Sequence, residues 1–136
     1  MATLGVAIVL GLVLLSGPGA TPPGDPAEAA TPPPPLVAPT DLHASANCDG
    51  FLTGQITVTW EASVSRSADG YIVFRSLGPG EQFVRVAVME GRGTTIHVDR
   101  GLEAGTQAFY SVQATDGARL STHTPVATAA VPALCF

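Results

Sequence analysis

The side chains of this sequence that could do acid–base chemistry are few and scattered. Seven carboxylates fall between residues 61 and 116, mostly at the ends of predicted strands or in turns: Glu61, Asp69, Glu81, Glu90, Asp99, Glu103 and Asp116. A glycosidase needs two carboxyl groups about 5–9 Å apart beside a groove. No spacing among these acids forces two of them into one cleft, so we predict no catalytic residue and no enzyme activity.

Histidine and cysteine offer metal or thiol chemistry, but their positions argue against a metal. His43, His97 and His123 lie on three different predicted strands, whereas the ligands of a zinc ion must converge. We therefore predict no metal site and no cofactor. The two cysteines, Cys48 and Cys135, follow a predicted export segment, and an even count in that setting predicts one disulfide.

The charge of the chain excludes some partner classes. The formal net charge is −5, and the sequence contains six arginines and no lysine. Without Asp25 and Glu28, which lie in a predicted linker, the chain has nine acidic residues and six arginines, which gives a net charge of −3. A mildly acidic domain without a basic stripe is a poor match for nucleic acid or for anionic lipid.

Residues 1–20 read as a signal peptide or a short membrane anchor. The apolar run 6–15 sits in a segment of about fifteen residues, which as a helix spans about 22 Å against a hydrocarbon core of about 30 Å. Small residues follow at positions 16–20, as in a cleavable signal. No basic residue precedes the run, so a retained anchor and a start further upstream remain open alternatives.

Residues 21–38 form a predicted Pro/Ala-rich disordered linker. Proline lacks a backbone donor and fixes φ, so this stretch cannot enter a helix or sheet. As an extended polyproline spacer, the nineteen residues from Thr21 to Pro39 would reach on the order of 60 Å. The linker is either a stalk that lifts the following domain from a membrane or a spacer with no partner of its own.

Residues 39–136 carry the pattern of an all-β sandwich. Apolar and polar residues alternate with a period of two, and turn residues interrupt them every eight to twelve positions. Seven strands are predicted, over residues 41–46, 56–60, 71–75, 83–88, 94–98, 107–115 and 120–131. We expect Trp60, Tyr71, Leu102 and Tyr110 to lie in the core.

Several motifs in residues 38–134 resemble the fibronectin type III family. They are the segment 39–42, Trp60, the run from Gly70 to Ser76, Phe83 with Val86 and Ala87, and the approach from Asp99 through Gly105 and Thr106 to Tyr110, Val112 and Ala114. The closest pattern is that of bacterial modules beside secreted carbohydrate-active enzymes and on surface proteins. The resemblance implies a seven-stranded immunoglobulin-like sandwich that serves as a spacer or binding unit.

The chain departs from the family at one corner. Family members usually have a tyrosine two residues after the threonine that corresponds to Thr106, and here that position is Ala108. Because its hydroxyl ties down the corner, we predict a looser corner. The family topology also brings the loop after the first strand and the end of the last strand to one pole, which would join Cys48 to Cys135.

The third strand suggests a contact patch. If Tyr71 and Val73 face the core, Ile72 and Phe74 face outward, and Phe109 on the neighbouring strand joins them. An exposed apolar patch of this kind often marks a contact surface. Ordinary surface hydrophobes, or residues covered by the proline arm, are the alternative.

Two further expectations concern loops and register. Loops over residues 63–68, 91–93 and 116–119 form a second candidate contact surface, because rigid sandwiches often place recognition there. The alternation of Ile96 and Val98 favours an inward position for both and sends His97 to solvent. The spacing to Leu102 in the family would instead turn His97 inward.

We therefore predict a non-catalytic extracellular binding or spacer module, secreted or tethered at the cell surface. Its expected partner is an unknown protein in the cell envelope. A carbohydrate-binding accessory module with a polysaccharide ligand is the alternative. It would need several exposed aromatic residues, and the one tryptophan is predicted to be buried. Membrane contact would come only from residues 1–20, if they are not cleaved.

Overall fold

The structure of the protein is a computed structural model that describes residues 31–136. The predicted signal or anchor over residues 1–20 and the linker residues 21–30 lie outside the described residues. Residues 35–136 form one compact unit. Among the residues that the structure describes, we find no helix of the length and hydropathy needed to span a membrane.

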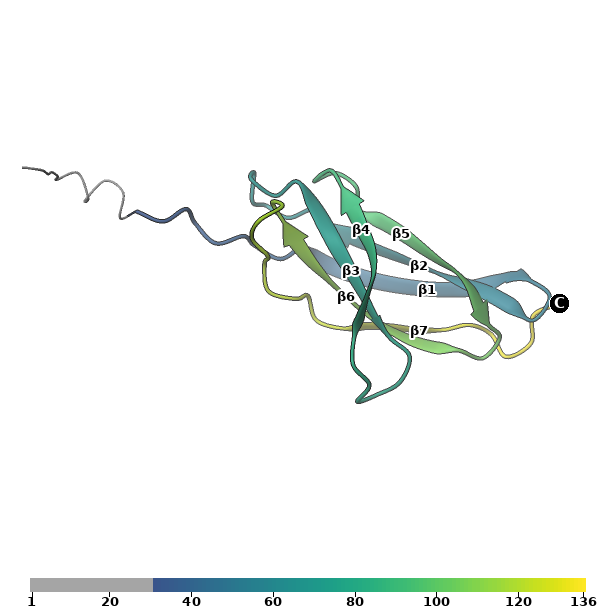
Figure 1. Ribbon diagram of the computed structural model, residues 1–136. Helices are drawn as coiled ribbons and strands as arrows, with labels where there is room; N and C mark the ends of the chain where they lie inside the picture. The colour runs from purple at the N-terminus through teal and green to yellow at the C-terminus, as the bar shows by residue number, and fades with distance from the viewer. Residues whose placement is uncertain (1–30) are drawn as a thin grey trace, which may run out of the picture. The chain divides into compact units, whose positions relative to one another are not determined.

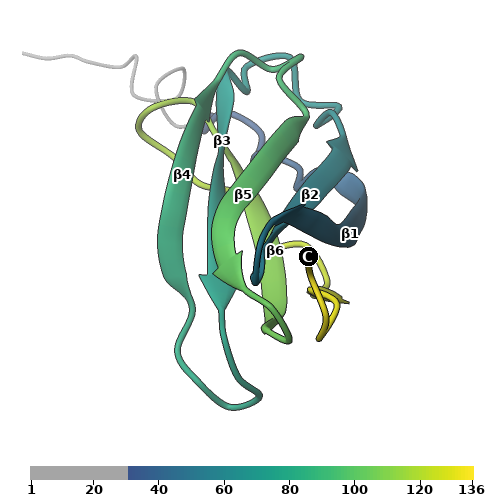
Figure 2. The same cartoon turned by 90° about the vertical axis from the view of Figure 1, so that its right-hand side faces the viewer.

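Seven strands build this unit: β1 (Thr40–Gly50), β2 (Thr53–Glu61), β3 (Gly70–Ser76), β4 (Val84–Glu90), β5 (Ile96–Glu103), β6 (Gln107–Thr115) and β7 (Ala127–Ala130). They form two antiparallel sheets, with the orders β1-β2-β5 and β4-β3-β6-β7. Figures 1 and 2 show the sheets packed face to face as two layers. The predicted all-β, seven-stranded sandwich is confirmed.

The core forms where the alternating side chains of the two sheets meet. On β2, Ile56, Val58 and Trp60 are buried while the threonines between them are half-buried. Tyr71 on β3 meets them from the other sheet, and its ring packs edge-on against that of Trp60 with centroids 5.4 Å apart. Tyr110 on β6 is also fully buried, as is nearly all of Leu102. Burial of such apolar surface is the main driving force for the fold.

The sandwich begins earlier in the chain than residue 39. Leu36 is buried in the core. The Ser63 hydroxyl donates to the Val37 carbonyl at 2.6 Å, and the Val37 amide donates to the Ser65 hydroxyl at 2.9 Å. Residues 36–38, which the sequence pattern assigns to the linker, therefore belong to the domain, because an apolar side chain and two hydrogen bonds hold them there.

The last predicted strand, residues 120–131, is regular only over β7. Upstream of it, the hydroxyls of Ser121 and Thr124 replace carbonyls as the acceptors for two β6 amides. The amides of the same two residues donate to β6 carbonyls. Ser121 and Thr124 are three positions apart, whereas their partners Ala114 and Val112 are two positions apart, so a regular ladder cannot form there.

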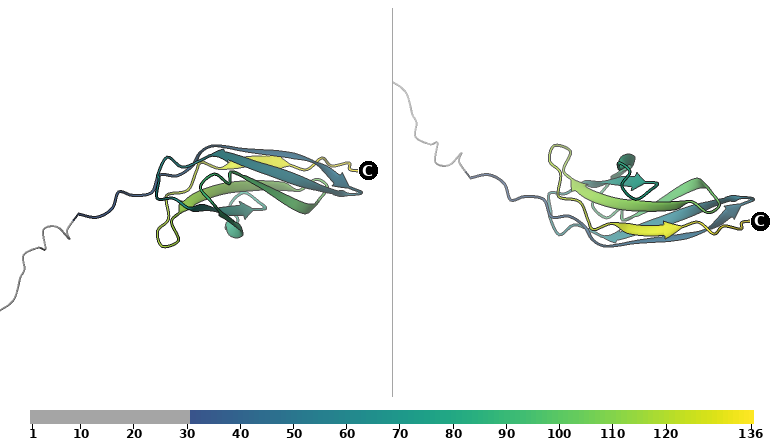
Figure 3. Two further views of the ribbon diagram at one scale, coloured as in Figure 1. Left: turned by 90° about the horizontal axis from the view of Figure 1, so that it is seen from above. Right: turned by 90° about the horizontal axis from the view of Figure 1, so that it is seen from below.

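The chain enters the sandwich at one end, and its C-terminus lies at the other (Figure 3). At the C-terminal end a disulfide joins Cys48 near the end of β1 to Cys135. The Leu52 amide donates to the Cys135 carbonyl at 2.9 Å. The disulfide and this hydrogen bond together fasten the end of the chain to the β1–β2 hairpin.

Candidate functional site

The outer face of the four-stranded sheet, which points away from the three-stranded sheet, carries the predicted contact patch. Ile72 and Phe74 of β3 lie on this face, because Tyr71 and Val73 between them are buried in the core. In the β3–β6 register, Phe74 stands opposite Ser111. The outward direction of the predicted patch residues is therefore as the alternation indicates.

Their exposure differs from the expectation. Ile72 is only 8 % exposed, and Phe74 and Phe109 are half-buried. Ile72 lies between Val88 of β4 and Gln113 of β6, in the middle of a sheet whose neighbouring side chains shield it. The expectation that Ile72 is an exposed contact residue is wrong, because a central strand is covered by its neighbours on both sides.

The segment before β7 brings a histidine onto the same face. The His123 ring lies against the ring of Phe74, with centroids 4.9 Å apart. Its Nδ1 atom is 2.6 Å from the hydroxyl of Ser111. Alternation could not have placed His123 here, because the irregular hydrogen bonds of residues 121–124 decide its direction.

Beside His123 lies a small hollow, which we call the apolar hollow. Its volume is about 220 Å³, and it is lined by Phe83, Ser111, His123, Thr124 and Val126. Val126 is 53 % exposed although it is a large apolar residue. The sequence analysis named none of these five residues as a contact candidate; it used Phe83 as a family marker and weighed His123 only as a metal ligand.

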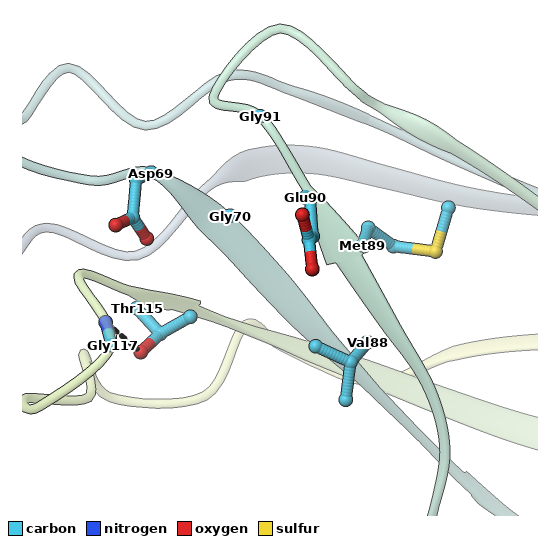
Figure 4. A pocket seen from close by; sticks show the side chains of 8 residues that line it. All are labelled: Asp69, Gly70, Val88, Met89, Glu90, Gly91, Thr115 and Gly117. Carbon is cyan, nitrogen blue, oxygen red and sulfur yellow. Dashed lines mark hydrogen bonds between the residues drawn. The ribbon is translucent and has the colours of Figure 1, made fainter.

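A second hollow opens on the same face at the end of the sheet where β3 begins (Figure 4). We call it the acidic hollow. It has a volume of about 470 Å³ and is lined by Asp69, Gly70, Val88, Met89, Glu90, Gly91, Thr115 and Gly117. Figure 4 shows the carboxylates of Asp69 and Glu90 at its rim and the Val88 side chain on its wall. Gly70 cannot be replaced freely, because a Cβ there would lie 2.3 Å from the Met89 carbonyl oxygen.

Inside the sandwich, a polar cluster connects the two sheets. Nη1 of Arg75 on β3 lies 3.1 and 2.9 Å from the two carboxylate oxygens of Asp99 on β5. The buried Tyr110 hydroxyl donates to Asp99 at 2.7 Å. Burial, followed by the hydrogen bond to Asp99, raises the pKa of Tyr110 above its ordinary value, so the hydroxyl keeps its proton.

His97 shares its side of β5 with Asp99. Ile96 is 51 % exposed, whereas His97 is half-buried and Asp99 is buried. The expectation that Ile96 faces the core and His97 faces solvent is wrong, because the Asp99 contact to Arg75 sets the register of β5. Desolvation lowers the pKa of His97, against an opposing effect of Asp99.

The loops at the N-terminal end are tied to the sandwich. The Arg92 guanidinium donates to the Ser63 carbonyl at 2.8 Å, and the Tyr71 hydroxyl donates to the Arg92 carbonyl at 2.6 Å. In the loop over residues 116–119, the Asp116 carboxylate accepts the amides of Ala118 and Arg119. These hydrogen bonds lower the pKa of Asp116 to about 2, and the one from the Arg119 amide has the largest effect. The contacts of Arg92 therefore hold the loop over residues 91–93 against the sandwich, and the contacts of Asp116 hold the loop over residues 116–119 together.

The possibility of catalysis centres on Ser111 and His123. A hydroxyl within hydrogen-bond reach of an imidazole is the first half of a nucleophile–base arrangement. Among the described residues, no carboxylate is hydrogen-bonded to His123, so the group that orients the base in a triad is missing there. The described residues also contain no group of three or more metal-ligating side chains.

A second apolar surface lies at the C-terminal end. Phe51 at the tip of the β1–β2 hairpin is 73 % exposed, and Leu52 and Leu134 are also exposed. Leu52 has a φ of 61°, a conformation that branched and bulky residues rarely adopt. The sequence reasoning did not single out this surface, because exposure at a hairpin tip is not visible in strand alternation.

Comparisons of the sequence with protein-family models and with curated proteins found no match. Comparison with solved structures found similar proteins. A Fn3-like protein from Clostridium thermocellum is 26 % identical with a TM-score of 0.59, covering 74 % of this chain and 98 % of that one. A β-1,2-glucanase from Parabacteroides distasonis is also 26 % identical with a TM-score of 0.59, covering 71 % of this chain and 13 % of that one.

A third neighbour, the FN1-FN3 domains of chicken CNTN1, is 22 % identical with a TM-score of 0.58 and covers 73 % of this chain and 34 % of that one. At that identity the likeness concerns the fold alone. The match to the clostridial protein spans nearly all of that chain, so the shared unit is a whole domain. With its strand orders β1-β2-β5 and β4-β3-β6-β7, this chain has the seven-stranded sandwich fold of fibronectin type III domains.

Proposed function

We propose that this chain is a non-catalytic, extracytoplasmic module that binds a protein of the cell envelope through the outer face of the four-stranded sheet. The observation that carries the proposal is the apolar hollow beside Phe74 and His123. Exposed apolar surface next to buried aromatic side chains is typical of contact sites. The face is built on a rigid sheet, so it needs little ordering when it binds.

The proposed location is supported by the disulfide between Cys48 and Cys135. Such bonds persist in oxidising compartments and are rare in the cytosol. The non-catalytic reading is supported by the Fn3-like protein among the structural neighbours.

Site-specific photo-crosslinking in the native host tests the protein partner. A photoreactive amino acid is placed at Val126, an exposed residue of the apolar hollow. The matched control carries the same amino acid at Ser45, which is exposed on the three-stranded sheet. We expect one discrete protein adduct from Val126 and none from Ser45.

Phe74→Ala in the Val126 crosslinking variant should weaken the adduct by about tenfold, because truncating a contact aromatic removes about 1–3 kcal/mol of binding. Thermal unfolding of Phe74→Ala checks that the domain remains folded. Equal adducts from Val126 and Ser45, or no adduct from Val126, would exclude a protein partner on this face.

The second candidate function is carbohydrate binding, favoured by the similarity to part of a β-1,2-glucanase. Carbohydrate modules use exposed aromatic rings, and here Trp60, Tyr71 and Tyr110 are buried. Native electrophoresis through gels that contain linear β-1,2-glucan separates the two candidates. Retardation that Phe74→Ala removes would support the carbohydrate ligand, and unchanged mobility would favour the protein partner.

A further inference from the structure

We infer that the partner of the outer face presents a lysine or arginine side chain to the acidic hollow and an apolar side chain to the apolar hollow. This inference rests on the proposed function, since it names the chemistry of the partner that the same face would bind. Neither hollow alone identifies the side chains of the partner. The charges of the two hollows and the spacing between them together identify those side chains.

The acidic hollow carries unbalanced negative charge. Asp69 and Glu90 are both exposed at its rim (Figure 4). Within the part of the chain that the structure describes, neither carboxylate joins an ion pair or accepts a hydrogen bond. Two loop cations are engaged elsewhere, since Arg119 is paired with Asp116 at 2.8 Å and the Arg92 guanidinium donates to the Ser63 carbonyl. A cation from a partner would therefore meet two available carboxylates.

The walls of the acidic hollow suit the stem of a long basic side chain. Val88 is 57 % exposed and lines the hollow, whereas the side chain of Met89 packs against the core on the inner side of β4. Lysine and arginine bury their methylene stems along apolar surface while the charged head reaches polar groups. Gly70 adds no side chain to the hollow, and the Met89 carbonyl oxygen lies where its Cβ would be.

The two hollows lie on one face at a defined spacing. Thr115 of β6 borders the acidic hollow and Ser111, four residues earlier, borders the apolar hollow. Four residues of a strand span about 13 Å. An extended partner segment places the side chains of residues i and i+4 on one side at that same spacing of about 13 Å.

The charges of the face also give the partner a direction. Arg85 of β4 is exposed and stands opposite Phe74, at the apolar end of the face. The carboxylates of Asp69 and Glu90 stand at the other end. Because Arg85 repels a cation and the carboxylates attract it, the basic residue of the partner belongs at the end of the face where β3 begins.

Peptide titration of the isotope-labelled full chain tests this inference by NMR. The probe is the blocked peptide Arg-Ser-Thr-Ser-Leu at millimolar concentration. The control peptide carries citrulline, a neutral isostere, in place of arginine. We expect the arginine peptide to shift the amide signals of Gly70, Gly91 and Gly117 and those beside the apolar hollow. The citrulline peptide should bind about tenfold more weakly, because it loses the charge-assisted contacts.

A matched pair of protein variants completes the test. Asp69→Asn combined with Glu90→Gln should weaken binding of the arginine peptide by about tenfold and reduce its salt dependence. Glu103→Gln, which removes an exposed carboxylate at the opposite end of the domain, should leave the binding unchanged. Equal binding of both peptides, equal binding by the Asp69/Glu90 double variant, or no shift at either hollow would overturn the inference.

The outcomes separate this inference from the proposed function. If Val126 crosslinks a protein but the arginine peptide does not bind, the protein-binding face stands and the basic chemistry of the partner falls. If the arginine peptide binds selectively but Val126 yields no adduct, the cation-binding hollow stands and the envelope partner falls.

Discussion

At the scale of single residues, a buried polar cluster of Arg75, Asp99 and Tyr110 joins the two sheets. Ala108 occupies the position of the expected tyrosine, and it is fully buried. Tyr110, two residues on, points its hydroxyl to Asp99, which also holds Arg75 of the opposite sheet. Because one carboxylate contacts both sheets, the cluster holds β5 of one sheet against β3 and β6 of the other. The predicted looser corner at Ala108 stays a prediction.

Tyr110→Phe should lower the free energy of unfolding by about 1.5–3 kcal/mol, because a hydrogen bond to a charged acceptor is lost inside the core. Chemical denaturation of the wild type, Tyr110→Phe, Asp99→Asn and the double variant measures the coupling between the two groups. We expect a coupling energy above about 0.5 kcal/mol. Additive effects of the two substitutions would contradict the assigned contact.

At the scale of elements, the β1–β2 hairpin is the point where local preference and observed structure disagree. Gly50 pairs with Thr53, which leaves Phe51 and Leu52 as a two-residue turn. Leu52 adopts a φ of 61° although glycine is the residue that does so without strain. The Leu52 carbonyl accepts the Ala104 amide at 3.0 Å, and its amide donates to Cys135. These two hydrogen bonds hold the turn in the unfavourable conformation.

Leu52→Gly should therefore stabilise the domain by about 0.5–1 kcal/mol, since glycine removes the cost of a left-handed backbone and the exposed leucine loses little burial. Thermal and urea unfolding measure the change. Thr53→Gly, at a neighbouring strand position without a positive φ, is the control and should destabilise. A loss of stability in Leu52→Gly would show that the leucine side chain contributes more than its backbone costs.

At the scale of the whole domain, one covalent bond closes most of the sandwich. The disulfide joins residues 87 positions apart and connects the end of the chain to β1. Closing so long a loop restricts the unfolded chain far more than the folded one. The same bond holds the exposed surface around Phe51 and Leu134 in place, next to the β1–β2 hairpin.

Replacing both cysteines by alanine should lower the free energy of unfolding by about 2–4 kcal/mol, with about 4–5 kcal/mol as the upper figure of the chain-entropy model. Guanidinium unfolding with and without a reducing agent gives the measurement. The reducing agent should shift the midpoint of the wild type and leave that of the double alanine variant unchanged. Coincident midpoints of the oxidised and reduced wild type would contradict a stabilising bond.

The fold class could be predicted from the sequence, because alternation with a period of two shows directly which side of a strand is buried. Trp60, Tyr71 and Tyr110 could be placed in the core on that basis alone. The tertiary structure decided the rest. It buried Ile72 between two neighbouring strands, turned His97 inward through the contact of Asp99 with Arg75, and brought His123 onto Phe74 through an irregular segment. Alternation describes one strand at a time, whereas exposure, register and hollows depend on which strands become neighbours.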